Sequence, residues 1–302
     1  MKGKIRFSKR KKDMLFYSAL LFIPLLQFAV FYVYVNINSI LLAFQNYSFI
    51  DGSTFAKFDN FKAVFSEIST NTVLQTSLKN TALVFVLGLV IGTMLPLLVS
   101  YYIYKKKPFA GVFRVILFMP SILSALVLVL AYKYFLEIAV PEIWLKLFDI
   151  KIEGLLSNPD SNFFFVLLYT YWFGFGSNFL LYLSAMSNIS ESVVESAKLE
   201  GVTPFQEFIY ITLPLIYPTF VTFVVVNIGT LFINQINLYS IYEIYAPDHM
   251  QTIGYYLYKE TARADMTGYP FLAAFGLLCT MVAVPCSLGI RWLLNKIGPS
   301  VE

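Results

Sequence analysis

Six long apolar stretches constrain the structure of this chain more than any other feature. They run approximately over residues 14–44, 77–104, 113–135, 162–186, 215–236 and 269–294. A helix of about 20 apolar residues crosses a hydrocarbon core of about 30 Å, so each stretch is long enough to span a bilayer. Lipid offers no hydrogen bonds to the backbone, whereas a helix satisfies its own. We therefore expect an all-α membrane protein with six transmembrane helices.

The composition excludes several other classes of protein. Of the 302 residues, 58% are hydrophobic and 13% are charged, whereas a soluble domain has roughly a quarter charged residues. A soluble enzyme and a disordered chain are therefore excluded. The two cysteines, Cys279 and Cys286, lie in one apolar run without the C-x₂-C spacing of metal sites. We expect no disulfide framework, no metal site and no catalytic residues.

The basic residues predict the orientation of the helices in the membrane. They precede the first stretch, follow the second and close the last, at Lys2, Lys4, Arg6, Lys9, Arg10, Lys11, Lys12, Lys105, Lys106, Lys107, Arg291 and Lys296. All of these positions fall on one side, which the positive-inside rule makes cytoplasmic. Both termini are thus expected inside the cell. Anchoring to anionic lipid explains the basic N-terminus more simply than nucleic-acid binding.

We expect one membrane domain without internal repeats. The first stretch is far longer than the apolar region of a signal peptide and has no small-residue cleavage site, so it is predicted to be retained. Asp51, Gly52 and Ser53 form a turn signal in the outer loop that follows it. The expected parts are a basic cytoplasmic N-terminus (1–13), a first helix with its outer loop (14–76), a transmembrane core (77–294) and a cytoplasmic tail (295–302).

The cytoplasmic segment 188–214 differs in character from the rest of the chain. It is predicted to form two short helices joined by a turn. Ser192 with Glu195 three residues later is a possible capping box, and Gly201 is placed to end the first helix in a left-handed conformation.

The second helix of this segment has its own start signal and an apolar face. Thr203 is its predicted cap, with Pro204 at the first helical position and Gln206 completing a capping box. Four residues recur at helical spacing, namely Phe205, Phe208, Ile209 and Leu213, with Glu207 on the other face. The apolar face can pack on its own bundle, lie at the lipid interface or dock into another protein.

Part of this segment resembles a known family motif. Residues 195–202 read Glu-Ser-Ala-Lys-Leu-Glu-Gly-Val, and residues 211–214 read Ile-Thr-Leu-Pro. This pattern resembles the EAA motif of ATP-binding-cassette importer permeases, with mild departures at Ser196, Glu200 and Val202. The resemblance extends from about residue 77 to the end of the chain. It implies a type I ABC importer permease fold, with the core at 77–294.

Two segments are similar to the carbohydrate, or maltose-type (MalF), branch of these permeases. They are residues 201–214 and residues 252–258. The amino-terminal half departs from the maltose permease, which has extra spans and a large external domain, whereas this chain has the six-helix core. The resemblance implies import of a sugar or oligosaccharide across a bacterial cytoplasmic membrane.

The resemblance also implies partners and a coupling site. The partners are a second, MalG-like permease, two cytoplasmic ATPases that hold ATP and Mg, and an external solute-binding protein, expected to be lipid-anchored. This chain has no G-x-x-x-x-G-K-[ST] loop, so we expect no cofactor and no ATP hydrolysis in it. Phe205 and Phe208 would anchor the ATPase, and Glu195 and Glu207 would either make polar contacts or form a solvated face. The full coupling set is Glu195, Ala197, Gly201, Pro204, Phe205, Glu207, Phe208, Leu213 and Pro214.

Uncharged polar residues in the fourth and fifth stretches predict the substrate pathway. In the fifth stretch, Asn227, Thr230 and Asn234 recur on one helical face. The fourth stretch contributes Thr170, Trp172, Gly174, Ser177 and Asn178. Amides, hydroxyls and aromatic rings suit a neutral polyol, and by resemblance these positions match the sugar site of the maltose-type permease. The alternative is that these residues hold the helices together.

Other functions remain as alternatives. The importer could carry glycerol phosphate, an amino acid or a peptide. A stand-alone secondary transporter would favour intramembrane carboxylates and a repeated half, and neither is evident in the sequence. A membrane-integral enzyme would need clustered His, Asp or Glu, whereas His249 is the only histidine.

Overall fold

The computed structural model describes residues 9–48 and 52–299. Lys2, Lys4 and Arg6 of the predicted basic N-terminus, Asp51 of the predicted turn and the last three residues of the predicted tail lie outside this range. The described chain is mostly helical and divides into two compact units. One contains residues up to Ser66 together with 263–278, and the other contains 67–262 together with the C-terminal part from Cys279.

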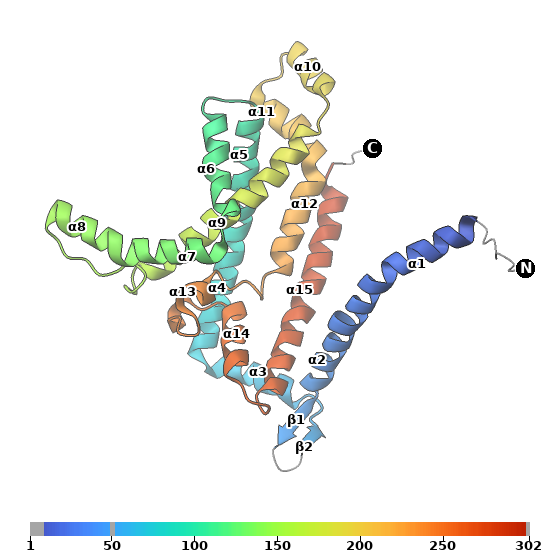
Figure 1. Ribbon diagram of the computed structural model, residues 1–302, viewed down its shortest axis with the longest axis vertical. Coiled ribbons are helices and arrows are strands. Elements are labelled where there is room, and N and C mark those ends of the chain that lie inside the picture. Colours follow the sequence, from blue (N-terminus) through green and yellow to red (C-terminus); the bar gives the residue numbers. More distant parts are fainter. Residues whose placement is uncertain (1–8, 49–51, 300–302) are drawn as a thin grey trace, which may run out of the picture. The chain divides into compact units, whose positions relative to one another are not determined.

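In the first unit, a long apolar helix leads into a small hairpin (Figure 1). Its elements are α1 (Lys9–Phe28), the π-helical η1 (Ala29–Tyr34), α2 (Val35–Ala43), β1 (Gln45–Ser48), β2 (Gly52–Phe55) and α3 (Asp59–Thr70), which runs on into the second unit. The antiparallel strands pair Gln45 with Phe55. Asn60 donates to the carbonyls of Ala43 and Gln45, at 3.0 and 2.8 Å, and so satisfies acceptors where α2 ends. This hairpin is a short addition to a mostly helical chain, in the loop that follows α2.

The second unit contains most of the remaining helices. In chain order they are α4 (Thr72–Leu87), η2 (Gly88–Met94), α5 (Leu95–Tyr104), α6 (Ala110–Ile122), α7 (Ala125–Tyr134), η3 (Phe135–Ala139), α8 (Val140–Phe148), α9 (Asn162–Ser187), α10 (Glu191–Leu199), α11 (Pro204–Glu207), η4 (Phe208–Thr212), α12 (Leu213–Gly229), α13 (Leu238–Tyr242), η5 (Asp248–Met250), α14 (Ile253–Arg263) and α15 (Tyr269–Ile297), whose first turns belong to the other unit.

Within residues 9–48 and 52–299, five continuous helices are long and apolar enough to cross a membrane. They are Phe16–Ala43, Thr72–Tyr104, Asn162–Ser187, Pro204–Gly229 and Tyr269–Ile297. Each overlaps one predicted stretch, so five of the six expected spans are present as helices. Three of them run without a break through a π-helical segment, namely η1, η2 or η4. The fifth predicted stretch, however, ends as a helix at Gly229, well before residue 236.

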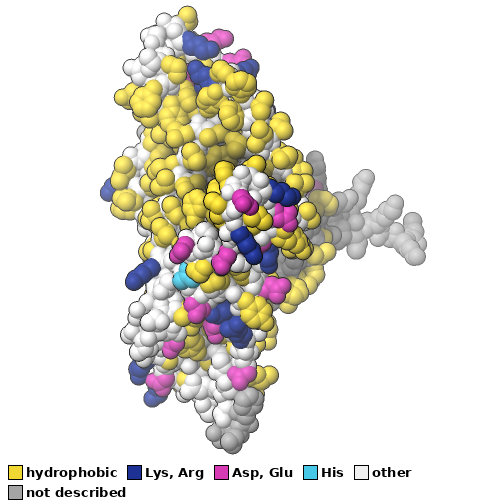
Figure 2. Space-filling view, turned by 90° about the vertical axis from the view of Figure 1, so that its left-hand side faces the viewer, with side chains coloured by type: hydrophobic (Ala, Val, Ile, Leu, Met, Phe, Trp, Pro, Cys, Tyr) yellow, Lys and Arg dark blue, Asp and Glu magenta, His cyan; other side chains and the backbone are white. Residues whose placement is uncertain are grey.

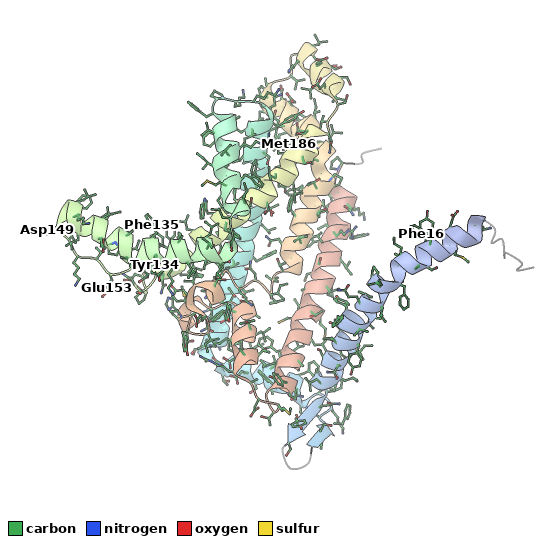
Figure 3. The ribbon with its side chains drawn as sticks, in the orientation of Figure 1. Phe16, Tyr134, Phe135, Asp149, Glu153 and Met186 are labelled. Atoms are coloured by element: carbon green, nitrogen blue, oxygen red, sulfur yellow. The ribbon has the colours of Figure 1, made fainter. Side chains whose placement is uncertain are left out.

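The third predicted stretch is not one straight helix. Within the described residues, Ala110–Ile122 and Ala125–Phe148 meet at an angle of 103°, so the helix expected over 113–135 is broken, and this bent pair is the candidate for the sixth crossing. Pro120 lies in the last turn before the bend, and Leu123 has an extended backbone. Figure 3 shows Tyr134 and Phe135 on the arm beyond the bend, which ends at Asp149 in a left-handed conformation.

Close approaches hold α5, α6 and α9 side by side (Figure 1). The buried hydroxyl of Ser100 on α5 donates to the carbonyl of Phe179 on α9, at 2.8 Å. A Cβ at Gly176 of α9 would lie 2.7 Å from the carbonyl oxygen of Leu117 on α6. Small residues that let helix backbones touch are typical of membrane bundles, where packing and interhelical hydrogen bonds hold helices together.

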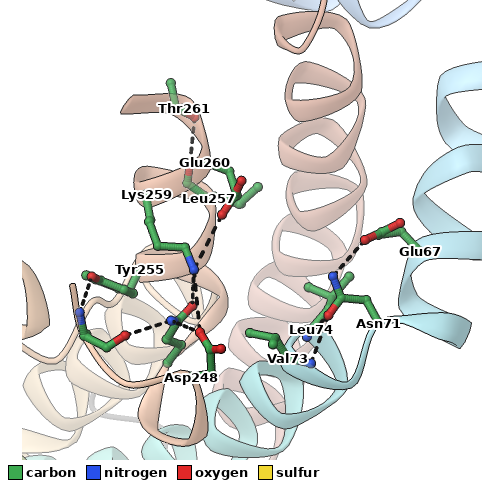
Figure 4. Close-up of polar contacts among 12 residues, drawn as sticks. Glu67, Asn71, Val73, Leu74, Asp248, Tyr255, Leu257, Lys259, Glu260 and Thr261 are labelled. Carbon is green, nitrogen blue, oxygen red and sulfur yellow. Dashed lines mark hydrogen bonds and ion pairs between the residues drawn. The ribbon is translucent and has the colours of Figure 1, made fainter. Parts of the chain in front are cut away.

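A polar network fixes the chain between α13 and α14 (Figure 4). Lys259 donates to the side chain of Gln251 at 3.1 Å, and its Nζ lies 3.8 Å from Asp248 and 3.5 Å from Glu260. Asn80 of α4 donates to the backbone carbonyl of Gln251, at 2.9 Å. The network ties this loop to α4.

Apolar side chains cover much of the surface. Figure 2 shows one face of the molecule on which hydrophobic side chains form broad patches. Val115 and Met119 of α6 and Leu126 and Val127 of α7 are all more than half exposed. Soluble monomers rarely expose contiguous apolar areas of this extent, so this surface is suited to lipid or to other membrane helices.

Candidate functional site

The predicted turn between the two loop helices is present. Gly201 has a φ of +73°, in the left-handed region that favours glycine. Its N–H donates to the carbonyl of Lys198 and that of Val202 donates to the carbonyl of Ala197, both at 3.1 Å. These two bonds form a Schellman motif, which ends α10 after Leu199. Ala197 is buried under this turn and is part of its framework.

One of the two predicted capping boxes is present and the other is not. The Thr203 hydroxyl accepts from the Gln206 N–H at 3.4 Å, and the Gln206 side chain accepts from the Thr203 N–H at 2.9 Å. At the other helix, the box on Ser192 and Glu195 is wrong, because the N-cap of α10 lies two residues earlier. Its N-cap is Ser190, whose hydroxyl hydrogen-bonds to that of Ser192.

Three apolar side chains of the loop segment are at least three-quarters exposed. Leu199 is 89% exposed, and Phe205 and Tyr210 are each 75% exposed. Glu195 and Pro204 are exposed as well. Leu199 and Tyr210 were not among the predicted site residues, although an apolar residue just before a terminating Gly is a detectable signal. An apolar surface of this kind, rimmed by polar residues, is typical of a docking site.

Two of the predicted docking residues lie inside the fold instead. Glu207 is 3% exposed and accepts two hydrogen bonds from Lys105, each 2.7 Å long. Phe208 is 7% exposed and packs against Tyr101, with 4.8 Å between the ring centroids. The expectation that Phe205 and Phe208 share one docking face, with Glu207 on the solvated side, is therefore wrong. The end of α5 lies under this segment and buries both side chains.

The helix that follows anchors the segment in the bundle. Leu213 and Pro214, at the start of α12, are half-buried. Leu213 and Phe208 join a cluster with Leu97, Tyr182 and Met186, the last labelled in Figure 3. Leu213 and Pro214 thus take part in packing within this chain.

A cavity of about 870 Å³ lies between η2, α9 and α12. Six of the eight predicted pathway residues line it, namely Thr170, Gly174, Asn178, Asn227, Thr230 and Asn234. The cavity is also lined by residues that were not predicted from the sequence, including Gly88, Gly92, Thr93, Ser184, Asn188, Thr219 and Thr222. Some signal for them existed, because Gly88 and Gly92 recur at helical spacing in the second stretch. None of the described residues that line the cavity carries a charge.

The cavity does not depend on a helical stripe in the fifth stretch. Because α12 ends at Gly229, Thr230 is its C-cap and Asn234 lies in the following turn, so the predicted stripe is wrong. Asn234 reaches the same cavity because the chain turns back. Its side-chain oxygen accepts from the N–H of Ile236, at 2.9 Å, which holds the turn.

Several of the polar groups that line the cavity also bind the backbone. Asn178 donates to the carbonyl of Gly92 at 2.8 Å, and Thr170 donates to that of Ile236 at 3.0 Å. These two contacts favour a packing role beside any role in binding. At Gly174, by contrast, a Cβ would meet nothing within 4 Å, so this glycine leaves space in the cavity and does not serve close packing.

Trp172 and Ser177 do not line this cavity. Trp172 borders a separate, almost wholly apolar groove with Leu95, Phe164 and Phe175. Ser177 is exposed beside the stripe that contains Gly174 and Asn178. A helix advances by about 100° per residue, which turns Trp172 to the face opposite Thr170. The expectation that these two residues lie with the others is therefore wrong.

A polar cavity between apolar, membrane-length helices defines a multi-pass membrane transport component. Residues 84–302 match the family described as "Binding-protein-dependent transport system inner membrane component". The chain belongs to this family and is a permease subunit of a binding-protein-dependent transporter in the cell membrane.

Two relatives with assigned names are transport system permease proteins, which is consistent with this family. The arabinooligosaccharides transport system permease protein AraP of Bacillus subtilis (strain 168) is 24% identical over 269 residues, covering 87% of this chain and 83% of AraP. The lactose transport system permease protein LacF of Rhizobium radiobacter is 29% identical over 164 residues, covering 53% and 55%.

A solved structure has the same fold. It is a chain of a bacterial alginate ABC transporter in complex with an alginate pentasaccharide-bound periplasmic protein. The TM-score is 0.76 with 22% identity, and the match covers 95% of this chain and 96% of that one. This confirms the expected type I permease fold.

Proposed function

We propose that this chain forms, with a second homologous permease, the pathway for a sugar or oligosaccharide in an ATP-driven importer. The observation that carries the proposal is the uncharged, polar-lined cavity of about 870 Å³. Its volume lies in the range of about 300–1,000 Å³ that is typical of small-molecule sites. Two of the helices that border it, Thr72–Tyr104 and Pro204–Gly229, also hold the loop segment with the exposed Phe205.

The chemistry of the cavity favours a neutral polyol. Asn227 and Asn234 supply amides, Thr222 a hydroxyl, and Tyr171 and Phe223 aromatic rings, which stack on the apolar faces of sugars. Glycerol phosphate, an alternative substrate, would favour a cation near the phosphate, and no described residue that lines the cavity is a lysine or arginine. The names of AraP and LacF support a carbohydrate.

The loop segment is the proposed docking site for the ATPases. Leu199, Phe205 and Tyr210 would enter a cleft of the partner, with Glu195 at the rim. Two ATPase subunits would hold ATP and Mg, and an external, lipid-anchored binding protein would deliver the solute. This arrangement places the segment and both termini in the cytoplasm, in agreement with the positions of the basic residues.

Reconstitution tests the proposal. The chain would be purified with the products of neighbouring reading frames and placed in proteoliposomes that contain ATP. A thermal-shift screen of the binding protein would choose the sugar. We expect uptake of that sugar to require ATP and the binding protein. Uptake that proceeds without any ATP-hydrolysing subunit would contradict the proposal.

A further inference from the structure

A buried ion pair joins the loop segment to the cytoplasmic end of α5. Lys105 follows the last residue of α5, and Glu207 is the last residue of α11. Their side chains are 15% and 4% exposed, with Nζ 2.7 Å from each carboxylate oxygen. A pair buried in this way holds its geometry far better than a solvated one, because either charge alone would be desolvated without a partner.

Two further contacts fix the same junction. The Tyr101 hydroxyl donates to the backbone carbonyl of Pro204, at 2.6 Å. The ring of Tyr101 also packs against that of Phe208. Three contacts of different kinds thus hold the start of the Pro204–Gly229 helix against the end of the Thr72–Tyr104 helix. Phe205, between these contacts in sequence, remains exposed.

Both joined helices reach the cavity. The helix that ends beside Lys105 carries Thr93, Gly92 and Gly88 on the cavity wall. Thr93 lies about 18 Å from Lys105 along this helix, at a rise of about 1.5 Å per residue. The helix that begins at Pro204 carries Asn227 on the same wall. At their far contact, a Cβ on Gly88 would lie 2.5 Å from Nδ2 of Asn227. A displacement of the loop segment would therefore move both of these cavity-lining helices only while the junction holds.

We propose that Lys105 and Glu207 are a positioning pair that makes α5 follow the loop segment when the ATPases close. This inference rests on the proposed function and adds to it a second route to the cavity beside the direct one through α12. Glu207 does not touch the ATPase in this mechanism. Loss of the pair leaves the docking surface intact, so that ATP is hydrolysed with little movement of solute.

The test uses the complete transporter in proteoliposomes. Lys105→Met and Glu207→Gln each remove one charge, and the double variant K105E/E207K restores a pair in the opposite sense. Lys106→Met is the matched control, because Lys106 is the adjacent lysine and its side chain is exposed. For each variant, recovery of the ATPase, ATP hydrolysis and solute uptake are measured, and the number of ATP molecules used per solute is calculated.

We expect the single variants to keep their ATPase partners and to use roughly tenfold more ATP per solute. The double variant and Lys105→Arg should recover most of the coupling, and Lys106→Met should behave as the unaltered protein. A merely structural pair would lower the yield of assembled transporter without changing the ATP used per solute. That result, or an assembled double variant no better coupled than the single ones, would overturn the inference. ATP-independent uptake by the unaltered transporter would instead overturn the proposed function, and this inference with it.

Discussion

The side chain of Asn178 donates a hydrogen bond to the backbone carbonyl of Gly92, 2.8 Å away, across the interface of α9 and the π-helical segment η2. In η2 the backbone departs from the i→i−4 pattern, which leaves carbonyls free for partners outside the helix. Both residues line the cavity. The bond therefore links the shape of the cavity wall to the packing of two membrane helices.

Replacing Asn178 tests this link. Asn178→Ala removes the donor to the Gly92 carbonyl, which should cost about 0.5–1.5 kcal/mol of stability. We expect lower thermal stability in detergent together with reduced uptake. Ser177→Ala is the control, since the exposed Ser177 does not line the cavity. Equal effects of the two substitutions would show that the bond has no special role.

Gly88 and Gly174 should respond differently to the same substitution. Gly88→Ala places a methyl group 2.5 Å from Nδ2 of Asn227, so the amide must move, at a cost of about 1–3 kcal/mol. Gly174→Ala meets nothing within 4 Å and should leave the fold intact while narrowing the cavity. Thermal unfolding and transport of sugars of increasing length distinguish the two effects. A destabilised Gly174→Ala protein would contradict the assignment of free space there.

Substitutions of the two phenylalanines of the loop segment should have different effects. Phe205→Asp changes an exposed side chain, so the protein should reach the membrane in normal amounts but lose the proposed ATPase partners and its uptake. Phe208→Ala opens a gap in the packed cluster and should cost about 3–5 kcal/mol of stability. Copurification and thermal unfolding measure the two properties. Normal uptake by the Phe205→Asp variant would count against docking through this residue.

Gly201 should tolerate no side chain that disfavours a positive φ. Gly201→Val forces a β-branched residue to a φ of +73°, at a cost of about 1–2 kcal/mol, and should loosen the end of α10. Gly201→Asn is the milder comparison, because asparagine adopts this region more readily. Uptake should fall much further with valine than with asparagine. Similar uptake by both variants would show that the turn does not depend on this backbone conformation.

The helices and the caps of the loop segment were predictable because they depend on nearby residues. Hydropathy over about 20 residues located five continuous spans. Thr203, Pro204 and Gln206 start a helix through contacts within one turn, and Gly201 ends another through its own backbone. Three of the five pathway residues predicted in the fourth stretch line the cavity, because this stretch is a regular helix with a polar face, whereas Asn234 reaches the cavity through a turn.

The bend after α6 was not predictable from hydropathy, because a broken apolar helix has the same average as a straight one. The position of the Trp172 side chain was also not predictable. An aromatic residue next to a polar stripe is compatible with sugar stacking, but only the packed bundle shows that its side chain faces a separate apolar groove.

The sequence by itself determined a multi-pass helical protein, a capped loop of two helices and the polar character of the central helices, since these follow from residues within a few turns of one another. Only the tertiary structure decided that Glu207 and Phe208 point inward. Lys105, the partner of Glu207, lies 102 residues away in the chain. The burial of a charged side chain depends on which distant group lies opposite it, and the local sequence pattern does not specify that neighbour.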